Sequence, residues 1–455
     1  MLSKMIRQCK LNRVQIVQQC IRSSVSNTTT NYENIRFDSI STAYGYKSKY
    51  ELFRGWLVFK LCSYKSLVNH LSQLLAISNT VLGQRLFGYI MRSTLYGHFA
   101  AGTDKDELKQ IAERLHKHGV KLILDYCMEA DLANNNQQKT NEEIYDKNVL
   151  RALKNTQTAA ELYSPSEMTS IKITSLVSPD ILQKLNQIIE EQESSNTLSI
   201  FELASKASII NKEELLEVEH FLERINRIIQ EVKNHNGRIF IDAEQSYFQT
   251  AIHKLVLELQ EHYNRDRFIV YNTYQCYRKT TLDTLRKDLI HAKKHGFNIG
   301  YKLVRGAYMD QERKRASKLH TIDPIHPNFA ATTECYHRAF IETLEYAKNN
   351  NNKVHVFVAS HNENTVQFAL KTMKSMNIKH NDGLVSFGTL LGMCDYLAFP
   401  LASVGCDVYK WAPYGPIDRL LPYLTRRAQE NRAIFAKAEK DRQLHFKALK
   451  ERIKN

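Results

Sequence analysis

The sequence predicts an α/β fold, a (β/α)8 TIM-like barrel with an N-terminal helical region and inserted helices. Eight short runs of apolar, often β-branched residues alternate with helical stretches. This pattern is typical of a parallel sheet, and a count of eight favours a closed barrel. Most of the runs are continuously apolar, as expected for strands buried on both faces. The predicted strands are Val120–Tyr126, Ser170–Thr174, Arg238–Asp242, Phe268–Asn272, Ile299–Val304, Val354–Ala359, Leu384–Phe387 and Val408–Ala412.

The segments around these strands define the other predicted parts of the chain. Apolar residues at helical spacing predict an N-terminal helical region over residues 33–118, and residues 119–432 would form the barrel. The interval of about 176–236 is too long for a simple connection and is rich in Glu, Leu and Ile, so we interpret it as a helical insertion. Residues 433–455 predict a basic, weakly amphipathic helix. It would be either a solvated terminal helix packed on the barrel or a membrane-surface helix.

The net charge of +15 is concentrated at the two ends of the chain. Residues 1–32 contribute five of these charges and contain no acid, and the residues from Arg419 onward contribute a net seven. Only three remain for the whole middle, which argues against a basic groove for nucleic acid. Residues 1–32 are also rich in Ser, Thr, Asn and Gln and lack a long apolar run. They are therefore interpreted as a mitochondrial transit peptide, the alternative being a disordered basic arm.

Several classes of protein are disfavoured by what the sequence lacks. No run approaches the roughly 18 consecutive apolar residues of a membrane-spanning helix. The eight cysteines are scattered without a C-x-x-C pair, which argues against a zinc site or a disulfide framework and for a reducing compartment. His291 and His295 have the spacing of a zinc pair but no H-E-x-x-H motif, so a solvated helix face is the better interpretation. No Rossmann fingerprint, P-loop or G-x-S-x-G elbow occurs, so any redox cofactor would be held by the barrel itself.

Polar residues follow seven of the eight predicted strands. In a barrel of this type the carboxyl ends of the strands face the active site. Each residue has a structural alternative: Lys172 could snorkel out of the sheet and Asp242 could cap a helix. Together they predict a site for a charged ligand that makes many contacts. The strand-end residues are Asp125, Tyr126, Glu129, Lys172, Asp242, Glu244, Gln245, Asn272, Tyr274, Gln275, Lys302, Arg305, Tyr308, Ser360, His361, Asn362, Lys410, Trp411 and Tyr414.

A helix predicted after Pro422 adds a second polar feature. Tyr423, Arg426, Arg427 and Glu430 are spaced so that they share one helix face. Two neighbouring guanidiniums can grip a small carboxylate in bidentate fashion. The alternative is a solvated face with a surface salt bridge, which by helix statistics alone would be favoured. The polar strand ends shift the interpretation toward a carboxylate clamp.

Five ordered motifs resemble the proline dehydrogenase family, most closely its mitochondrial eukaryotic members. They are Arg238-Ile-Phe-Ile-Asp-Ala-Glu-Gln, Val270-Tyr-Asn-Thr-Tyr-Gln-Cys-Tyr, Lys302-Leu-Val-Arg-Gly-Ala-Tyr, Ala359-Ser-His-Asn and Tyr423-x-x-Arg-Arg-x-x-Glu-Asn. The resemblance runs from about Ala43 to Arg452. It implies an FAD flavoprotein, an oxidoreductase acting on a CH–NH donor. L-Proline would be oxidised to 1-pyrroline-5-carboxylate by hydride transfer to flavin N5, the first step of proline catabolism to glutamate. Electrons would pass to ubiquinone, with the enzyme on the matrix side of the mitochondrial inner membrane as a peripheral protein.

The resemblance also implies roles for individual residues. Arg426 and Arg427 would clamp the substrate carboxylate, and Glu129 would pair with Arg426. Catalytic roles around the substrate amine fall to Lys172, Asp242 and Tyr308, and the other substrate contacts implied are Tyr423, Trp411, Leu390 and Glu430. The cofactor contacts implied are Asn272, Gln275, Lys302, Val304, His361 and Asn362, and no metal is expected.

Two residues depart from the family pattern. Trp411 stands where relatives selective for proline usually have a tyrosine, and Lys302 stands where bacterial relatives have an arginine. A bulky indole should still exclude a ring hydroxyl, so the expected substrate is proline. The alternatives are a hydroxyproline dehydrogenase of the same family and, more distantly, a barrel lyase forming a Schiff base through Lys172. A non-enzymatic membrane- or nucleic-acid-binding protein with two basic ends is a further alternative.

Overall fold

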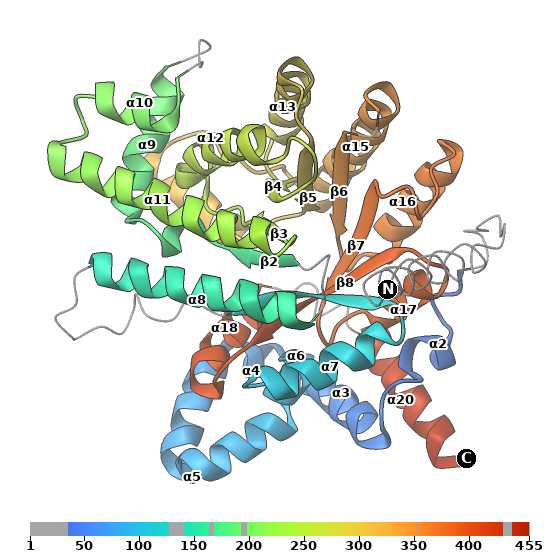
Figure 1. Cartoon of the computed structure of the whole chain (residues 1–455). Coiled ribbons are helices and arrows are strands. Elements are labelled where there is room, and N and C mark those ends of the chain that lie inside the picture. Colours follow the sequence, from blue (N-terminus) through green and yellow to red (C-terminus); the bar gives the residue numbers. More distant parts are fainter. Residues whose placement is uncertain are drawn as a thin grey trace, which may run out of the picture. The chain divides into compact units, whose positions relative to one another are not determined.

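Eight parallel strands, adjacent in chain order, close into a barrel in the computed structural model of this protein (Figure 1). The structure describes residues 35–126, 141–162, 168–192, 198–351, 353–430 and 439–454, and only the backbone of Lys65, Asn141 and residues 426–430. The predicted fold class is confirmed. The strands are β1 (Val120–Tyr126), β2 (Met168–Ile171), β3 (Arg238–Ile241), β4 (Val270–Gln275), β5 (Ile299–Val304), β6 (Val354–Ala359), β7 (Val385–Leu390) and β8 (Asp407–Tyr414).

The barrel closes between its last strand and its first. β8 pairs with β1 over seven residues, from Val120 opposite Val408 to Tyr126 opposite Tyr414. Alternate residues of each strand point inward, and a buried layer of large side chains fills the lumen below the carboxyl ends. Phe240 and Phe357 meet there edge to face with ring centroids 5.2 Å apart. The barrel is therefore solid in the middle, and open space is confined to its carboxyl end.

The predicted bounds of the second strand are wrong. The strand ends at Ile171, and Ile173–Ser175 form a 3₁₀ turn instead. The cause is a tertiary contact: the Glu244 carboxylate accepts hydrogen bonds from the Thr174 amide at 3.0 Å and from its hydroxyl at 2.6 Å. These bonds satisfy the amide away from the sheet ladder. The predicted fourth and seventh strands both end too early, since β4 continues to Gln275 and β7 to Leu390.

Helices surround the barrel and extend it at both ends of the chain (Figure 1). They are α2 (Ile40–Tyr44), α3 (Lys49–Cys62), α4 (Lys65–Asn69), α5 (Leu71–Ser93), α6 (Leu95–Phe99), α7 (Lys105–His116), α8 (Asn141–Leu162), α9 (Pro179–Glu191), α10 (Ile200–Lys206), α11 (Lys212–Asn234), α12 (Ser246–Tyr263), α13 (Thr281–His295), α14 (Met309–Leu319), α15 (Phe329–Asn349), α16 (Glu363–Ser375), α17 (Asp395–Ser403), α18 (Ile417–Glu430) and α20 (Glu439–Lys454). Among the residues that the structure describes, no helix combines the length and apolarity needed to cross a membrane.

Three helices, α9, α10 and α11, lie between β2 and β3. α11 begins at a capping box in which Asn211 and Glu214 bond each other's backbone amides. Its apolar residues recur at helical spacing, and Val218, Phe221 and Ile225 are fully buried. They join one hydrophobic cluster with α9, α12 and the outer faces of β3 and β4. These helices thus extend the outer layer of the barrel on one side.

A buried charge cluster joins the N-terminal helices to the barrel. We call it the Asp395 cluster: Asp395 at the start of α17, Lys410 of β8, and Lys47 and Tyr46 before α3. The Asp395 carboxylate lies 2.6 Å from Lys47 Nζ and 2.7 Å from Lys410 Nζ, and it accepts a hydrogen bond of 2.8 Å from the Tyr46 hydroxyl. The cluster fixes β8 immediately beside Trp411.

The C-terminal helix α20 packs beside α3 and meets the same cluster. Lys47 Nζ lies 3.1 Å from Nε2 of the buried His445. Asp441, one turn earlier on α20, accepts hydrogen bonds from the Cys394 amide at 3.2 Å and from the Tyr44 hydroxyl at 3.3 Å. The chain's two described ends are therefore tied to the loop after β7.

Candidate active site

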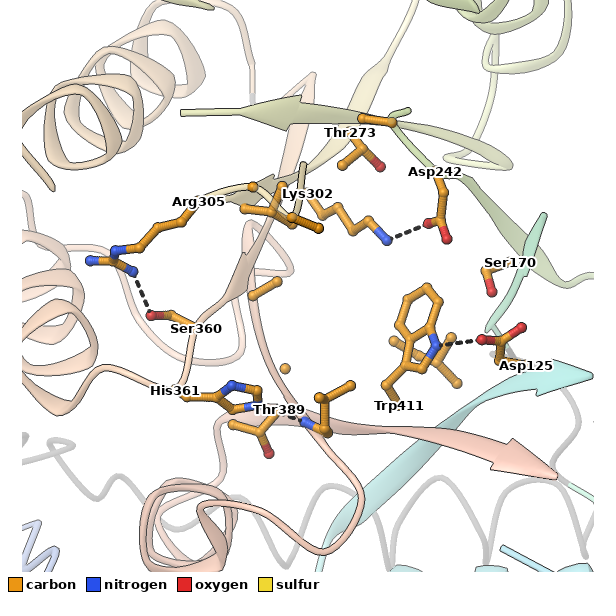
Figure 2. Close-up of a pocket in the computed structure, with 18 of the residues that line it drawn as sticks. Asp125, Ser170, Asp242, Thr273, Lys302, Arg305, Ser360, His361, Thr389 and Trp411 are labelled. Carbon is orange, nitrogen blue, oxygen red and sulfur yellow. Dashed lines mark hydrogen bonds and ion pairs between the residues drawn. The ribbon is translucent and has the colours of Figure 1, made fainter. Parts of the chain in front are cut away.

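A cavity of about 620 Å³ opens at the carboxyl ends of the strands. All eight strands or the loops that follow them contribute to it (Figure 2). Helix α18 adds Tyr423. Its polar lining residues include Asp125, Ser170, Lys172, Asp242, Thr273, Gln275, Lys302, Arg305, Tyr308, Ser360, His361, Asn362, Thr389, Trp411 and Tyr423. A pocket of this size and mixed polarity suits a small organic ligand or a cofactor.

Asp125, at the end of β1, holds two aromatic walls of the cavity. Its Oδ2 accepts hydrogen bonds from the Trp411 indole Nε1 at 3.0 Å and from the Tyr423 hydroxyl at 3.3 Å. Burial raises the pKa of the Asp125 carboxyl, against the lowering effect of the bond from Trp411. The sequence placed Asp125 at a strand end without a role. The inward period of β1, which Asp125 shares with Ile123, was the signal that could have identified it.

Lys302 of β5 lies against the other side of the indole. Its ammonium pairs with Asp242 Oδ1 at 2.6 Å and lies 4.1 Å from the Trp411 ring centroid (Figure 2). It is also 5.1 Å from the Phe240 ring centroid. A buried cation over an aromatic face gains electrostatic stabilisation that is stronger than in water. Trp411 is thus held at its edge by Asp125 and at its face by Lys302.

A second cation, Arg305, lies between β5 and α16. It donates to Ser360 Oγ at 3.0 Å and to Thr365 Oγ1 at 2.7 Å, and the Phe329 ring lies 5.1 Å from its guanidinium carbon. Within the described residues, its Nε has no hydrogen-bond partner. The arrangement places a positive charge and the N-terminus of α16 on the same wall of the cavity, which favours an anionic group there.

His361 is fixed in one neutral form. Burial lowers the pKa of its imidazole to about 3, so the ring is uncharged at physiological pH. The Leu390 amide donates to His361 Nε2 at 3.0 Å, so that nitrogen carries no proton and Nδ1–H is the remaining donor. His361 therefore offers a ligand one hydrogen-bond donor and no charge.

A family model described as proline dehydrogenase matches residues 108–440. The chain belongs to the proline dehydrogenase family. It is 31% identical to mitochondrial proline dehydrogenase 1 of Drosophila melanogaster, over 92% of this chain and 81% of that protein. It is 30% identical to the Homo sapiens protein of the same name, over 92% of this chain and 90% of that one. It is also 35% identical to hydroxyproline dehydrogenase of Xenopus laevis, over 90% of this chain and 88% of that protein.

Solved structures of the bacterial proline utilization A proteins share the fold. The structure from Bdellovibrio bacteriovorus aligns with a TM-score of 0.62 at 18% identity, over 86% of this chain. This chain spans only 38% of the length of that one. At such low identity the likeness shows the (β/α)8 architecture and nothing finer.

Most of the residues for which the family resemblance implied a role lie together in this cavity. The structure places eleven of them on its lining: Lys172, Asp242, Gln275, Lys302, Val304, Tyr308, His361, Asn362, Leu390, Trp411 and Tyr423. Arg426, Arg427 and Glu430 lie in α18, but their side chains are outside the described part of the chain, and so is the whole of Glu129. The proposed carboxylate clamp thus stays a prediction, anchored by the position of Tyr423 on the same helix.

Asn272 is the implied cofactor residue that the structure does not bring to the cavity. Its side-chain amide instead lies 3.0 Å from Nδ1 of His253 on α12. The reason is strand alternation: Thr273 and Gln275 of β4 face inward and line the cavity, so Asn272 faces the surrounding helices. Thr273 is the inward residue that the sequence analysis did not single out.

The histidine pair on α13 also lies away from the cavity. His291 and His295 stack with ring centroids 4.1 Å apart, and both bond the Glu261 carboxylate of α12, at 3.0 and 2.8 Å. All three side chains are about one-third exposed. They form an interhelical hydrogen-bonded group at the outer surface of the barrel.

Proposed function

We propose that this protein is an FAD-dependent proline dehydrogenase, which oxidises L-proline to 1-pyrroline-5-carboxylate and passes the electrons to ubiquinone. The observation that carries the proposal is the cavity wall made by Asp125, Trp411, Lys302 and Asp242: a fixed aromatic face between two carboxylates and a cation. Such a wall suits a small saturated ring that carries both an ammonium and a carboxylate. Membership of the proline dehydrogenase family supports the same reaction.

The cavity has groups that fit a flavin. Gln275 Oε1 and Thr389 Oγ1 are buried, line the cavity and have no hydrogen-bond partner within the described residues. Buried polar atoms are normally satisfied, so these two indicate a ligand with complementary donors and acceptors on its edge. His361 Nδ1–H and Lys302 would add donors, and Arg305 would hold the cofactor phosphates. When bound, FAD supplies the two-electron oxidant that accepts hydride at flavin N5.

The protein residues would position the substrate and manage its charge. Trp411 and Tyr423 enclose the ring, and Arg426 and Arg427 would grip the substrate carboxylate from α18. Asp125 and Asp242 offer carboxylates to the substrate ammonium, which must lose a proton before hydride leaves readily. Lys172 and Tyr308 would influence that proton from the facing walls. Catalysis in this arrangement comes mainly from orientation.

Trp411 bears on the choice between proline and hydroxyproline. Its indole cannot tilt away without losing the bond to Asp125 and the contact with Lys302. A fixed indole leaves little room for a hydroxyl on the substrate ring, so the proposed substrate is L-proline. The 35% identity to a hydroxyproline dehydrogenase makes hydroxyproline the second candidate.

The deciding experiment is a visible spectrum of the purified protein, followed by substrate comparison. We expect flavin absorbance that is bleached anaerobically by L-proline, and a kcat/KM for L-proline well above that for trans-4-hydroxy-L-proline. The reverse preference would assign the second candidate. A colourless protein, or one that borohydride links covalently to its substrate through Lys172, would reject the dehydrogenase. Arg427→Lys tests the clamp: it should raise the KM for proline by orders of magnitude with the flavin spectrum unchanged.

The same proposal covers the cellular setting. Residues 1–32 would act as a mitochondrial transit peptide, and the mature enzyme would be peripheral on the matrix side of the inner membrane. The proline dehydrogenase relatives of Drosophila melanogaster and Homo sapiens are named mitochondrial, which supports the compartment. Import of a fusion carrying residues 1–32 into isolated mitochondria, with loss of the leader, would test the transit peptide.

A further inference from the structure

Helix α5 carries an exposed apolar face. Leu74, Ile77 and Val81 follow helical spacing and are 41%, 61% and 76% exposed. Leu86 and Tyr89, one turn apart in the second half of the helix, are 50% and 70% exposed. We call these five residues the α5 face. Single exposed apolar residues are ordinary, but a group of five along one helix marks an interaction surface.

The second half of α5 is packed against α18 through its other side. Phe87 and Met91 are buried against Leu420 and Leu421 of α18. Gly83, with φ of +70° and ψ of 158°, interrupts the helix between its two halves. The residues from Ser72 to Leu86 are almost all exposed, so the first half of α5 projects from the domain while the second half is anchored. The α5 face therefore points away from the barrel, on a helix whose second half is held in place by α18.

The segment of the chain that contains α5 lacks acidic residues. The 52 residues from Leu52 to Thr103 contain no Asp or Glu, although the chain as a whole has 48 acids in 455 residues and would average about five over such a length. The same segment contains five Lys and Arg residues. Arg85 lies exposed beside the α5 face, while Arg92 pairs with Glu107 at 2.8 Å. α5 itself therefore carries no carboxylate that would repel an anionic partner, and its exposed Arg85 would attract one.

A second patch of similar composition lies on the adjoining helices. Phe53 of α3 and Phe446 of α20 are about half exposed and flank Trp56, with ring centroids 5.8 and 6.0 Å from it. Lys447 is exposed, and the ammonium of Lys450 lies 6.0 Å from the Phe446 ring centroid. Aromatic residues flanked by lysines are typical of groups that sit at the headgroup level of a bilayer. α3, α4, α5 and α20 lie together below the barrel in the view of Figure 1.

We infer that the α5 face binds the surface of an anionic lipid bilayer, with α5 lying in the plane of the headgroups. This inference rests on the proposed function for its setting, because a quinone acceptor is dissolved in a membrane. The occupant is assigned from charge: in a symmetric pair of this chain, Arg85 would meet another α5, which carries no acid to pair with it and whose own Arg85 would repel it. Nucleic acid is anionic but offers nothing to bury Ile77 and Val81. A lipid surface satisfies both the apolar side chains and the cations.

The test uses the full chain and two kinds of vesicle, phosphatidylcholine alone and phosphatidylcholine mixed with an equal amount of phosphatidylglycerol. The wild-type protein should float with the anionic vesicles and bind the neutral ones less. Ile77→Ser combined with Val81→Ser should reduce the partition coefficient for anionic vesicles at least tenfold. The matched control is Ile290→Ser combined with Ile322→Ser, which removes two side chains that are 68% and 87% exposed elsewhere on the protein and should bind like wild type.

Three results would overturn the inference: no binding of wild type to anionic vesicles, equal binding by the two double variants, or a dimer in light scattering that only the α5 variant dissociates. Proline turnover with a soluble dye as acceptor separates this outcome from the proposed function. Turnover that persists in the α5 variant while vesicle binding is lost supports the surface. Vesicle binding by a protein without proline turnover would reject the function and leave the surface standing.

Discussion

Replacing Asp395 by asparagine tests whether the buried charge cluster holds the barrel and the terminal helices together. Asp395 and Lys410 are each 1% exposed at the side chain and Lys47 is 7% exposed, so solvent cannot compensate for a lost charge. Asp395→Asn keeps the shape and removes the carboxylate that two ammoniums share. Breaking a buried ion pair by removing one partner costs about 3–5 kcal/mol, because it leaves uncompensated charge.

The expected change in melting temperature follows from size. The compact unit Arg36–Asn455 would unfold with an entropy near 0.9 kcal/mol/K, from about 2.1 cal/mol/K per residue. A loss of about 3–5 kcal/mol then lowers Tm by about 3–6 °C. Scanning calorimetry measures it. Asp283→Asn is the matched control, because Asp283 pairs with Arg286 while its own side chain is 73% exposed, and such pairs contribute about 0–1 kcal/mol.

The sign of the pH dependence gives a second readout. Burial alone would raise the pKa of Asp395, but Lys410 and Lys47 hold it far below its ordinary value of 3.8. The carboxylate therefore contributes stability above the unfolded pKa, and this contribution is lost as the pH falls toward the folded pKa. Adding Lys47→Met to Asp395→Asn should restore part of the lost Tm by removing a stranded cation. A Tm for Asp395→Asn equal to that of Asp283→Asn, or a double variant less stable than the single one, would refute the reasoning.

Three further substitutions probe the site and its supports. Asp125→Asn keeps an acceptor for Trp411 but removes its charge, and should raise the KM for L-proline about tenfold with flavin absorbance retained; an unchanged KM would mean that the carboxylate is only structural. Burial raises the pKa of Asp441 to about 6 from 3.8. Its stabilising effect is thus present below about pH 4 and lost as the pH rises through 6. Asp441→Asn should therefore reduce the change of Tm with pH between those two values. A pH dependence of Tm identical to that of wild type would contradict this. Gly306→Ala should abolish soluble expression or cost several °C in Tm, because its Cβ would lie 1.5 Å from the Tyr277 ring at a φ of +143°; a soluble variant with wild-type Tm would show that the loop relaxes.

The strand pattern was readable from sequence because each strand is buried on both faces. β1, β5 and β6 have the predicted bounds, since their apolar runs coincide with the hydrogen-bonded ladder. β2 does not, because Glu244 captures Thr174 from 70 residues away, and no local pattern records that contact. Asn272 was assigned to the cavity from the family resemblance and from its place at the end of the predicted fourth strand. Extending that strand to Gln275 and applying its two-residue period would have placed Thr273 inward instead.

The supports of the site were beyond the reach of sequence. Asp395 and Lys410 lie on neighbouring elements, but Lys47 reaches them from about 350 residues away, and nothing in its local sequence marks it as buried. In contrast, the strand-end rule identified most of the cavity lining, because the topology of a parallel barrel brings all carboxyl ends to one rim. The topology of the barrel thus determines which residues line the cavity, whereas ion pairs between distant segments depend on how the whole chain packs.

The anchoring of Trp411 constrains how this enzyme can evolve. A single change from tryptophan to a small polar residue would strand the buried Asp125 carboxylate without the indole N–H and expose the Lys302 ammonium to a void. Asp125, Trp411, Lys302 and Asp242 therefore behave as one coupled group. A substitution at position 411 alone would disturb the charges of the cavity wall as well as its shape, and compensating changes at the other three positions would be needed to separate the two effects.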